Sequence, residues 1–313
     1  MRVLVTGAGG FVGSWLLRDL LGEGHEVFAG TSDPLPPEGQ GARWVAMDVT
    51  SDDSVRRALE AAAPDAVYHL AGQSSVGASF GDPLGTWDVN ATGTLRLVAA
   101  LPKGARLLFV GSGEAYGVVP EDEQPIREDR PLRPTNPYAA SKAAAEMAVL
   151  QAAASGGVQA VAARSFNHTG PGQDTRFAIA SFARQLAQLR AGGASPVLRV
   201  GNLSPRRDML DVRDVVRAYR VLMERGESGA VYNVASGRAP SIREMVEILI
   251  DLSGTGARVE VDPERVRPTD VPVLRGDASR LRALGWEPRI PLRQTLADLL
   301  EHEARALDAA EAA

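Results

Sequence analysis

Short apolar runs alternate with amphipathic helical windows along the first half of the chain, and this alternation is the strongest constraint on its fold. The helical windows include 11–24, 52–63 and 87–101. Strand–helix alternation predicts βαβ units, so we expect an α/β protein with a doubly wound parallel sheet of the Rossmann type. Six runs have the near-continuous apolar character of strands buried on both faces of such a sheet: 2–7, 26–31, 43–49, 65–72, 106–112 and 158–166.

The alternation changes after residue 166. We expect a dinucleotide-binding domain over residues 1–166, to which segments near 205–236 return. A smaller, mixed α/β substrate-binding lobe is expected to take up most of 167–313, and a Ser241/Glu244 capping box starts one of its helices. Its other predicted elements are a helix at 176–192, a strand near 196–203, a helix near 211–225 and a strand at 230–236.

Composition argues against several classes of function. The chain has no cysteine, which removes thiolate nucleophiles and Cys-ligated zinc, and we expect no metal site. A net charge of −5, with arginines scattered among acids, gives no electrostatic reason to expect nucleic acid as a partner. No apolar run approaches the roughly 18 residues of a membrane span. The N-terminal run has no cleavage site and is typical of a first strand, so we expect a cytoplasmic protein without a membrane partner.

The segment TGAGGFVG places Gly7, Gly10 and Gly13 between the first predicted strand and the first predicted helix. Such a turn lets the backbone approach a pyrophosphate, and the helix N-terminus offers free N–H groups and a positive dipole to the anion. The spacing is G-x-x-G-x-x-G and not the more usual G-x-G-x-x-G, so a simple tight turn is the alternative. The strand–turn–helix context favours a dinucleotide site.

The ends of the next two strands bear on which dinucleotide binds. The second strand ends in Thr31-Ser32-Asp33, where many NAD enzymes place an acid for the ribose hydroxyls. No arginine follows closely to favour a 2′-phosphate, and the choice between NADH and NADPH stays open. Thr31 and Ser32 are cofactor-binding candidates. Asp48 is a candidate for binding the adenine amino group or, alternatively, for capping the helix that begins near residue 52.

Tyr138 and Lys142 are the leading catalytic candidates. Asn136-Pro137 is typical of a helix start, which places the two side chains one turn apart on one face. Only two of the 34 basic residues are lysines, so arginine is the habit of this chain. A compact ammonium can lower the pKa of a phenol, ordinarily about 10, and bind two ribose hydroxyls, whereas a guanidinium fits that task poorly. A surface tyrosine beside a snorkelling lysine is the plainer alternative.

The segment GSGEAYG supplies Ser112 at the end of strand 106–112, where open parallel sheets place their ligands. We expect the Ser112 hydroxyl to orient a substrate oxygen beside Tyr138; an ordinary turn serine is the alternative. Gly113 and Glu114 follow this serine. Gly113 has no side chain that could act as an acid, whereas Glu114 offers a carboxylate.

Together these motifs resemble the extended short-chain dehydrogenase/reductase family of nucleotide-sugar epimerases and dehydratases, over essentially the whole chain. The motifs are TGAGGFVG, HLAG (69–72), Asn90 in DVNATGT, GSGEAYG, PYAASK and RDMLDVRDV (207–215). The narrower resemblance is to GDP-4-keto-6-deoxy-D-mannose reductases. It is carried by SFNHTGPGQ (165–173), VGNLSPRRDMLDVRDV (200–215), AVYNVASG (230–237) and RPTDVPVLRGDASRLRALGWEP (267–288).

The resemblance implies roles for the matching positions. Tyr138 is implied as the general acid/base and Lys142 as its helper, while Asn167, Arg207 and Arg267 would hold the sugar nucleotide and its diphosphate. For the arginines a surface ion pair is the alternative, and for His168 a structural or cofactor-contacting role is favoured over a catalytic one. The implied cofactor contacts are Gly7, Gly10, Phe11, Val12 and Gly13 at the pyrophosphate, Asp48 and Val49 at the adenine, and Leu70, Ala71, Gly72, Phe166 and His168 elsewhere.

The implied activity is NAD(P)H-dependent reduction of the C4 carbonyl of a nucleotide-linked 4-keto-6-deoxyhexose, converting GDP-4-keto-6-deoxy-D-mannose to GDP-D-rhamnose. A GDP-mannose 4,6-dehydratase and a UDP-glucose-type 4-epimerase use the same Ser/Tyr/Lys set and remain alternatives. The resemblance implies that a dehydratase needs further acid and base groups after Ser112, so the missing side chain of Gly113 argues for simple carbonyl reduction. Glu114 is then a partner for a substrate hydroxyl or, in a dehydratase, the base. A non-catalytic dinucleotide-binding module is a further alternative. The family also implies a homodimer, in which the Ala-rich helix after Lys142 could face a partner, although a contact within the chain would explain that helix equally well.

Overall fold

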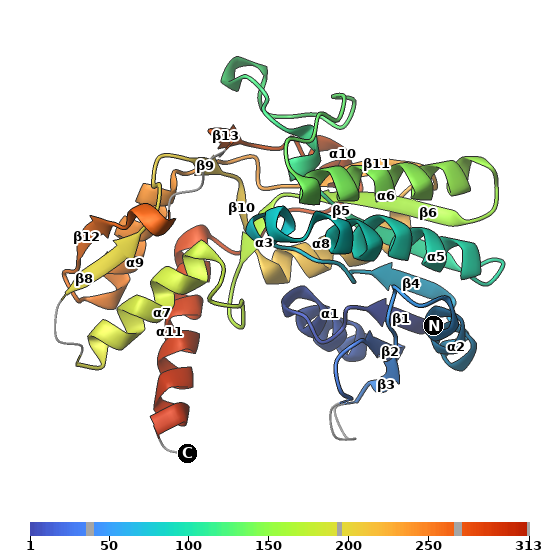
Figure 1. Ribbon diagram of the computed structural model, residues 1–313, viewed down its shortest axis with the longest axis horizontal. Coiled ribbons are helices and arrows are strands. Elements are labelled where there is room, and N and C mark those ends of the chain that lie inside the picture. The colour runs from blue at the N-terminus through green and yellow to red at the C-terminus, as the bar shows by residue number, and fades with distance from the viewer. Residues whose placement is uncertain (36–40, 193–195, 266–270, 312–313) are drawn as a thin grey trace.

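The computed structural model describes residues 1–35, 41–192, 196–265 and 271–311. A parallel sheet of seven strands forms the centre of the protein, in the order β11-β6-β5-β4-β1-β2-β3 (Figure 1). Strand order reverses on either side of β1, which opens a crevice at the carboxyl ends of the strands. The strands are β1 (Arg2–Thr6), β2 (Glu26–Thr31), β3 (Arg43–Ala46), β4 (Ala66–His69), β5 (Arg106–Ser112), β6 (Gln159–Ser165) and β11 (Val231–Val234).

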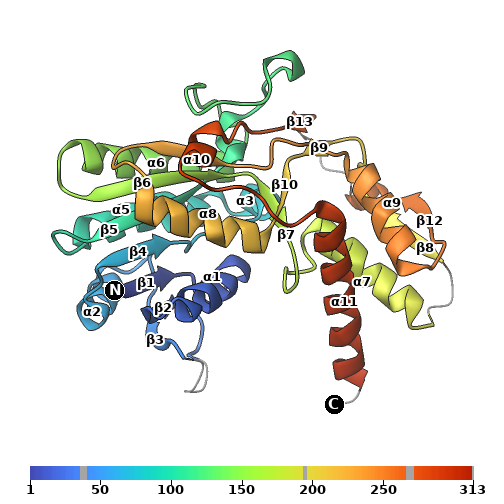
Figure 2. The same cartoon turned by 180° about the vertical axis from the view of Figure 1, so that it is seen from behind.

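Helices cover both faces of this sheet, so the expected doubly wound α/β fold is confirmed (Figures 1 and 2). One hydrophobic cluster packs α1 (Phe11–Gly22) and α8 (Val212–Arg225) against one face. A second cluster packs α2 (Asp52–Ala62), α5 (Gly93–Ala100) and α6 (Pro137–Ala154) against the other. All six strands expected in the first half of the chain are present, and β11 pairs with β6.

The helix expected over 87–101 is interrupted. It consists of the end of α4 (Pro83–Trp87), a π-helical turn at Asp88–Thr92 and then α5, and a short α3 (Val76–Gly81) precedes it. The buried Asn90 lies in the π-helical turn, and its Nδ2 donates to the Gln73 carbonyl at 3.0 Å and to Ser141 Oγ at 2.9 Å. π-Helical turns are often found at functional sites, and this one directs a side chain from the α4–α5 helix onto α6.

A second, smaller group of elements has its own core. A third hydrophobic cluster contains α7 (Ala178–Arg190), α9 (Ile242–Ser253), α11 (Leu292–Glu311) and β8 (Val197–Val200). The predicted capping box at α9 is confirmed, because Ser241 Oγ accepts from Glu244 N and Glu244 accepts from Ser241 N. The remaining elements are β7 (Asn167–Thr169), β9 (Arg206–Arg207), β10 (Met209–Asp211), β12 (Arg258–Val261), β13 (Val273–Leu274), α10 (Ser279–Ala283) and the 3₁₀ turns η2 (Gly113–Tyr116), η3 (Glu121–Glu123) and η4 (Pro263–Arg265).

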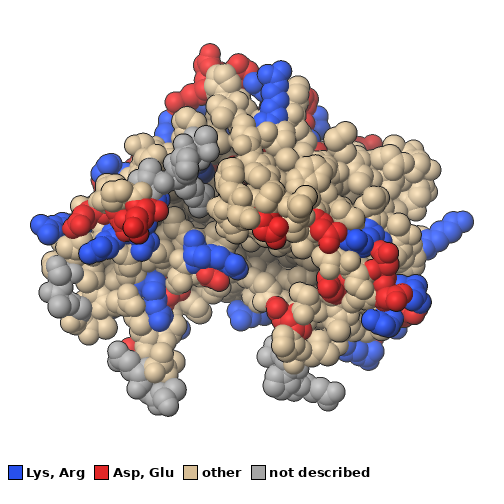
Figure 3. All heavy atoms as spheres, viewed as in Figure 1, with Lys and Arg blue, Asp and Glu red and all other residues tan. Residues whose placement is uncertain are grey.

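The surface carries charges of both signs. Figure 3 shows basic and acidic side chains interspersed over the face drawn, which agrees with the scattered arginines of the sequence. Within the described part of the chain, no helix combines the length and apolar character that crossing a membrane requires.

Candidate active site

A cavity of about 1110 Å³ opens at the carboxyl ends of the central strands, between the sheet and the smaller lobe. Every predicted site residue that the structure describes lines this cavity, and Arg267 lies outside the described residues. The cavity-lining residues that the sequence singled out are Gly7, Gly10, Phe11, Val12, Gly13, Thr31, Ser32, Asp48, Val49, Leu70, Ala71, Gly72, Ser112, Glu114, Tyr138, Lys142, Phe166, Asn167, His168 and Arg207. Their individual roles stay predictions.

The glycine turn forms a cradle that side chains would fill. Gly7 has φ +66°, and a Cβ there would lie 2.8 Å from the backbone of Ala71. A Cβ on Gly13 would lie 2.7 Å from the carbonyl oxygen of Ala8, so α1 packs directly on the turn. Gly10 is the N-cap of α1 and provides no side-chain cap, so the N–H groups of the first turn remain available to an anion. This arrangement fits the pyrophosphate of a dinucleotide.

Two carboxylates line the cavity just beyond the neighbouring strands β2 and β3. A Cβ on Gly9 would lie 3.8 Å from Asp33 Oδ2, which places this carboxylate over the turn. Asp48 accepts hydrogen bonds from the Thr50 N–H at 2.8 Å and hydroxyl at 2.7 Å, and these bonds lower its pKa. The alternative role of Asp48, capping the helix near residue 52, belongs to Ser51, whose Oγ accepts from Ser54 N.

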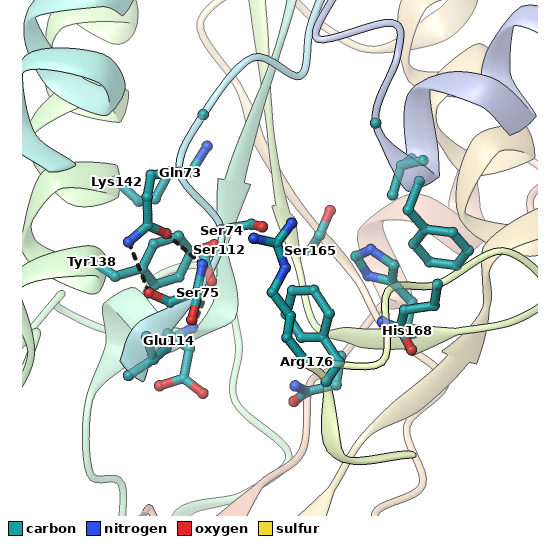
Figure 4. Close-up of a pocket in the computed structure, with 18 of the residues that line it drawn as sticks. Gln73, Ser74, Ser75, Ser112, Glu114, Tyr138, Lys142, Ser165, His168 and Arg176 are labelled. Atoms are coloured by element: carbon teal, nitrogen blue, oxygen red, sulfur yellow. Dashed lines mark hydrogen bonds between the residues drawn. The ribbon is translucent and has the colours of Figure 1, made fainter. Parts of the chain in front are cut away.

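Tyr138 and Ser112 lie next to each other on one side of the cavity, opposite His168 (Figure 4). Asn136 caps α6 by accepting from Ala139 N at 2.8 Å, and the first turn of the helix then presents Tyr138. Burial raises the pKa of Tyr138 to about 12; hydrogen bonding with Ser112 acts in the opposite direction, and the charge of Glu114 adds to the rise. The phenol is therefore protonated at neutral pH.

Lys142 lies one turn after Tyr138 and is buried against β5. Its ammonium donates to the Val110 carbonyl oxygen at 2.9 Å and lies 5.5 Å from the centre of the Phe109 ring. Burial lowers the pKa of Lys142 to about 8. The sequence predicts an ammonium that lowers the pKa of Tyr138, but burial raises the pKa of this phenol, and the group that acts against the rise is the Ser112 hydroxyl and not Lys142.

A buried histidine supports the floor of the site. Thr94 Oγ1 donates to the Asn90 carbonyl at 2.6 Å, so His69 Nε2 must be the donor in its 2.9 Å bond to Thr94 Oγ1. His69 Nδ1 then accepts from Thr6 Oγ1 at 2.8 Å, and Thr6 Oγ1 accepts from Ala71 N at 3.0 Å. Burial lowers the pKa of His69 to about 3. A neutral His69 therefore fixes the end of β1 against the backbone at Ala71.

The far wall of the cavity is formed by the segment after β6. The His168 ring stacks on Phe11 with centroids 6.2 Å apart, and its Nδ1 lies 3.0 Å from the Phe166 carbonyl oxygen. Burial lowers the pKa of His168, so the ring is neutral near pH 7. Asn167 Oδ1 is buried and has no hydrogen-bond partner among the described residues, so it is available to a ligand.

Arg207 is buried, so the alternative interpretation of this arginine as part of a surface ion pair does not apply. Its Nη1 donates to the Val271 carbonyl oxygen at 2.6 Å.

Arg176 also lines the cavity, although the sequence did not single it out, and Figure 4 shows its guanidinium directed into the space between Ser112 and His168. Ser165 was missed too; its Oγ lies 2.6 Å from the hydroxyl of the buried Tyr219. The only sequence signal for Arg176 is its place in a polar loop directly before a helix.

Comparison with known proteins gives the family. Residues 4–299 match the profile of GDP-mannose 4,6 dehydratases. The chain belongs to this family. It is 40% identical over 308 residues to the GDP-6-deoxy-D-mannose reductase of Pseudomonas aeruginosa, with 96% of each chain covered. The resemblance to nucleotide-sugar enzymes of the extended short-chain dehydrogenase/reductase type is thereby confirmed.

Solved structures of family relatives share the fold. The structure of RMD from Pseudomonas aeruginosa complexed with NADPH has a TM-score of 0.87 and 39% identity, and the match covers 97% of this chain and 99% of that one. The UDP-glucose 4-epimerase of Thermus thermophilus, solved with NAD, has a TM-score of 0.86 and 32% identity, with 97% and 99% covered. The family thus contains reductases, dehydratases and epimerases on one fold, and the fold alone does not choose among them.

Proposed function

We propose that this protein is an NAD(P)H-dependent reductase that acts on the C4 carbonyl of a nucleotide-linked 4-keto-6-deoxyhexose, converting GDP-4-keto-6-deoxy-D-mannose to GDP-D-rhamnose. The observation that carries the proposal is that Ser112, Tyr138 and Lys142 share one cavity with the glycine turn. The identity of 40% to a GDP-6-deoxy-D-mannose reductase supports the choice of substrate.

The residues of the cavity fit the proposed reduction. The bound nicotinamide cofactor would supply a hydride to C4 of the sugar. Tyr138 would donate its proton to the C4 oxygen, and its pKa of about 12 keeps the phenol in the protonated form that a reduction needs. The Ser112 hydroxyl would orient the same oxygen, and the Lys142 ammonium would hold the ribose of the cofactor. Glu114 and Asn167 would bind hydroxyl groups of the sugar, while Arg207 would bind the nucleotide portion.

Gly113 supports reduction over dehydration. A Cβ at this position would lie 3.1 Å from atoms of the Phe166 ring, which is closer than ordinary van der Waals contact. An acidic or hydroxyl side chain at 113 would therefore require Phe166 to move. Without that side chain, the site lacks at position 113 the additional proton donor that elimination of the C6 hydroxyl would use.

Three parallel incubations test the proposal. With GDP-4-keto-6-deoxy-D-mannose, generated in situ by a GDP-mannose dehydratase, and NADH or NADPH, we expect oxidation of the cofactor and a GDP-6-deoxyhexose product. GDP-mannose alone should give no 4-keto product; its appearance would establish the dehydratase alternative. UDP-glucose without added reductant should give no UDP-galactose, whereas the epimerase alternative requires it. Absence of turnover in all three incubations would favour the non-catalytic module.

We also propose a division into a dinucleotide-binding domain over 1–166, joined by segments near 205–236, and a substrate-binding lobe over most of 167–313.

A homodimer in the cytoplasm is proposed as well. The support for the dimer is a set of exposed apolar side chains on α4, α5 and α6: Leu84, Trp87, Leu95 and Met147. Light scattering of the wild-type protein and of a Leu84→Glu/Met147→Glu variant tests this, and a monomeric wild-type protein would contradict it.

A further inference from the structure

Arg164, on β6, joins helix α6, which carries Tyr138 and Lys142, to the turn η2, which directly follows Ser112. Its Nε donates to both carboxylate oxygens of Glu146 on α6, at 2.9 and 3.2 Å, and its Nη2 donates to one of them at 2.6 Å. Its Nη1 donates to the Tyr116 hydroxyl at 2.7 Å and to the Glu128 carbonyl at 3.0 Å. One guanidinium therefore connects α6 with Tyr116, the last residue of η2.

The ion pair is almost completely removed from water. The side chains of Arg164 and Glu146 are 7% and 3% exposed. Desolvation of two charges largely cancels their attraction, so a buried ion pair adds little stability compared with apolar side chains of similar volume. What a two-point pairing of a guanidinium with a carboxylate does supply is a fixed geometry. The Arg164–Glu146 pair is therefore better suited to setting a position than to stabilising the fold.

Helix α6 needs such a constraint because of its composition. Half of its 18 residues are alanine, so it packs closely on the sheet but offers few large side chains that would lock it along its axis. Tyr138, Lys142 and Glu146 are spaced by four residues on one face. Two polar contacts of this face anchor α6 to the central sheet, that of Lys142 with the Val110 carbonyl on β5 and that of Glu146 with Arg164 on β6. A shift of one residue along the helix moves each side chain by about 1.5 Å.

The Nη1 atom of Arg164 fixes the turn η2 through Tyr116. The Tyr116 hydroxyl accepts from Arg164 and donates to Asn233 Oδ1 on β11 at 2.8 Å, and the guanidinium lies 4.8 Å from the centre of the Tyr116 ring. Ser112 begins this same turn, since its Oγ accepts from Glu114 N at 3.2 Å. Arg164 thus holds both the turn that starts at Ser112 and the helix that carries Tyr138.

We propose that Arg164 is a positioning residue that sets the place of α6 along its axis relative to η2, and thereby aligns Tyr138 with Ser112. It is not among the described residues that line the cavity, so it acts through Glu146 and Tyr116 and not on the substrate. The inference rests on the proposed reductase function, in which a displacement of about 1 Å between reacting groups can slow turnover by about a hundredfold.

The decisive variant replaces the whole pair, Arg164→Met/Glu146→Met, because removing one partner would leave a buried charge and threaten folding. We expect kcat to fall by at least about tenfold, while the KM for the sugar nucleotide and the Kd for the cofactor stay within about twofold, because the glycine turn and the far wall are unchanged. The matched control is Arg184→Met/Glu303→Met, which removes a partly buried ion pair in the smaller lobe and should leave kcat unchanged.

Two milder variants keep the test informative if the double variant does not fold. Glu146→Asp retains the charge on a shorter side chain, and Tyr116→Phe removes the hydroxyl that binds both Arg164 and Asn233. Each should lower kcat with little change in KM. Wild-type kcat in the double variant, or in both milder variants, would overturn the inference, as would equal losses in kcat and cofactor affinity.

A crystal structure of the folded variant with the lowest kcat adds a readout that does not depend on the reaction. We expect α6 to be displaced along its axis relative to η2, and an unchanged position would overturn the inference. A wild-type protein that lacks reductase activity would count against the proposed function. The position of α6 in the double variant, or in Glu146→Asp if the double variant does not fold, would then still decide the role of Arg164.

Discussion

Tyr138 and Lys142 lie one turn apart on α6, and burial moves their pKa values in opposite directions, that of the phenol up to about 12 and that of the ammonium down to about 8. Near neutral pH both groups therefore carry their protons. The pair is set for proton donation by Tyr138, which agrees with a reductive direction of catalysis.

The pKa of Lys142 predicts opposite pH dependences for activity and stability. If the ammonium is needed, kcat/KM should decline above about pH 8, by up to about tenfold per pH unit. The contribution of Lys142 to stability should change the other way. Its folded-state pKa lies below the ordinary 10.5, so the unfolded chain binds more protons between about pH 8 and 10.5, and stability increases with pH in that window.

Initial rates and thermal melts between pH 7 and 10 measure both effects. Lys142→Met is the control, because it should remove the decline in rate above pH 8 together with most of the activity. It should also melt at a higher temperature than the wild type at pH 7, since it no longer buries a charge. A wild-type rate that stays flat up to pH 10 would contradict the assignment of the ammonium.

Replacing Tyr138 by phenylalanine should remove the proton donor while keeping the packing of α6. We expect kcat to fall by about 10²–10⁴-fold, the usual contribution of a positioned acid or base, with little change in cofactor affinity. The matched control is Tyr68→Phe, which changes another buried tyrosine, on β4, whose pKa burial also raises. Near-wild-type turnover of Tyr138→Phe would exclude the proposed mechanism.

The fold was predictable because a parallel sheet buried on both faces leaves near-continuous apolar runs in the sequence. The candidate site residues were predictable where a motif fixes them to a strand end or a helix start, as for Ser112 and Tyr138. Contacts between distant segments leave no such signal. Arg164 and Glu146 are separated by 18 residues, and their pairing follows from the packing of α6 on β6. The π-helical turn at Asp88–Thr92 adds one residue to an otherwise ordinary helical pattern.

Asp33 predicts a preference for NADH over NADPH. Its carboxylate lies over Gly9 at the mouth of α1. Asp48 also lines the cavity and directly follows Met47, whose N–H donates to the Thr31 carbonyl at 2.8 Å, so it adds a second negative charge beside the end of β2. A 2′-phosphate placed there would face two carboxylates, whereas a free 2′-hydroxyl could donate to Asp33. We expect kcat/KM to favour NADH by at least about tenfold, a difference of about 1.4 kcal/mol.

Asp33→Asn should reduce this preference for NADH, because it removes the repulsion between the carboxylate and the 2′-phosphate of NADPH and keeps the shape of the side chain. Asp48→Asn is the matched control and should change the ratio less, since Thr50 already binds the Asp48 carboxylate. The ratio of kcat/KM values, measured at two ionic strengths, separates charge from shape because salt screens only the former. A wild-type preference for NADPH, the cofactor found with the Pseudomonas aeruginosa relative, would contradict this reading of Asp33.

Two glycines of the same helix should respond oppositely to alanine. A Cβ on Gly13 would press on the carbonyl oxygens of Gly7 and Ala8, so Gly13→Ala must push α1 away from the turn. Overpacking of this kind costs about 1–3 kcal/mol, and the widened turn should weaken cofactor binding at least about tenfold. Gly22 has no atom within 4 Å of its added Cβ, so Gly22→Ala should stabilise α1 by up to about 1 kcal/mol through helix propensity. Denaturant unfolding and cofactor titration of the two variants test this. Equal cofactor affinity in both would show that close packing of α1 on the glycine turn is not what holds the dinucleotide.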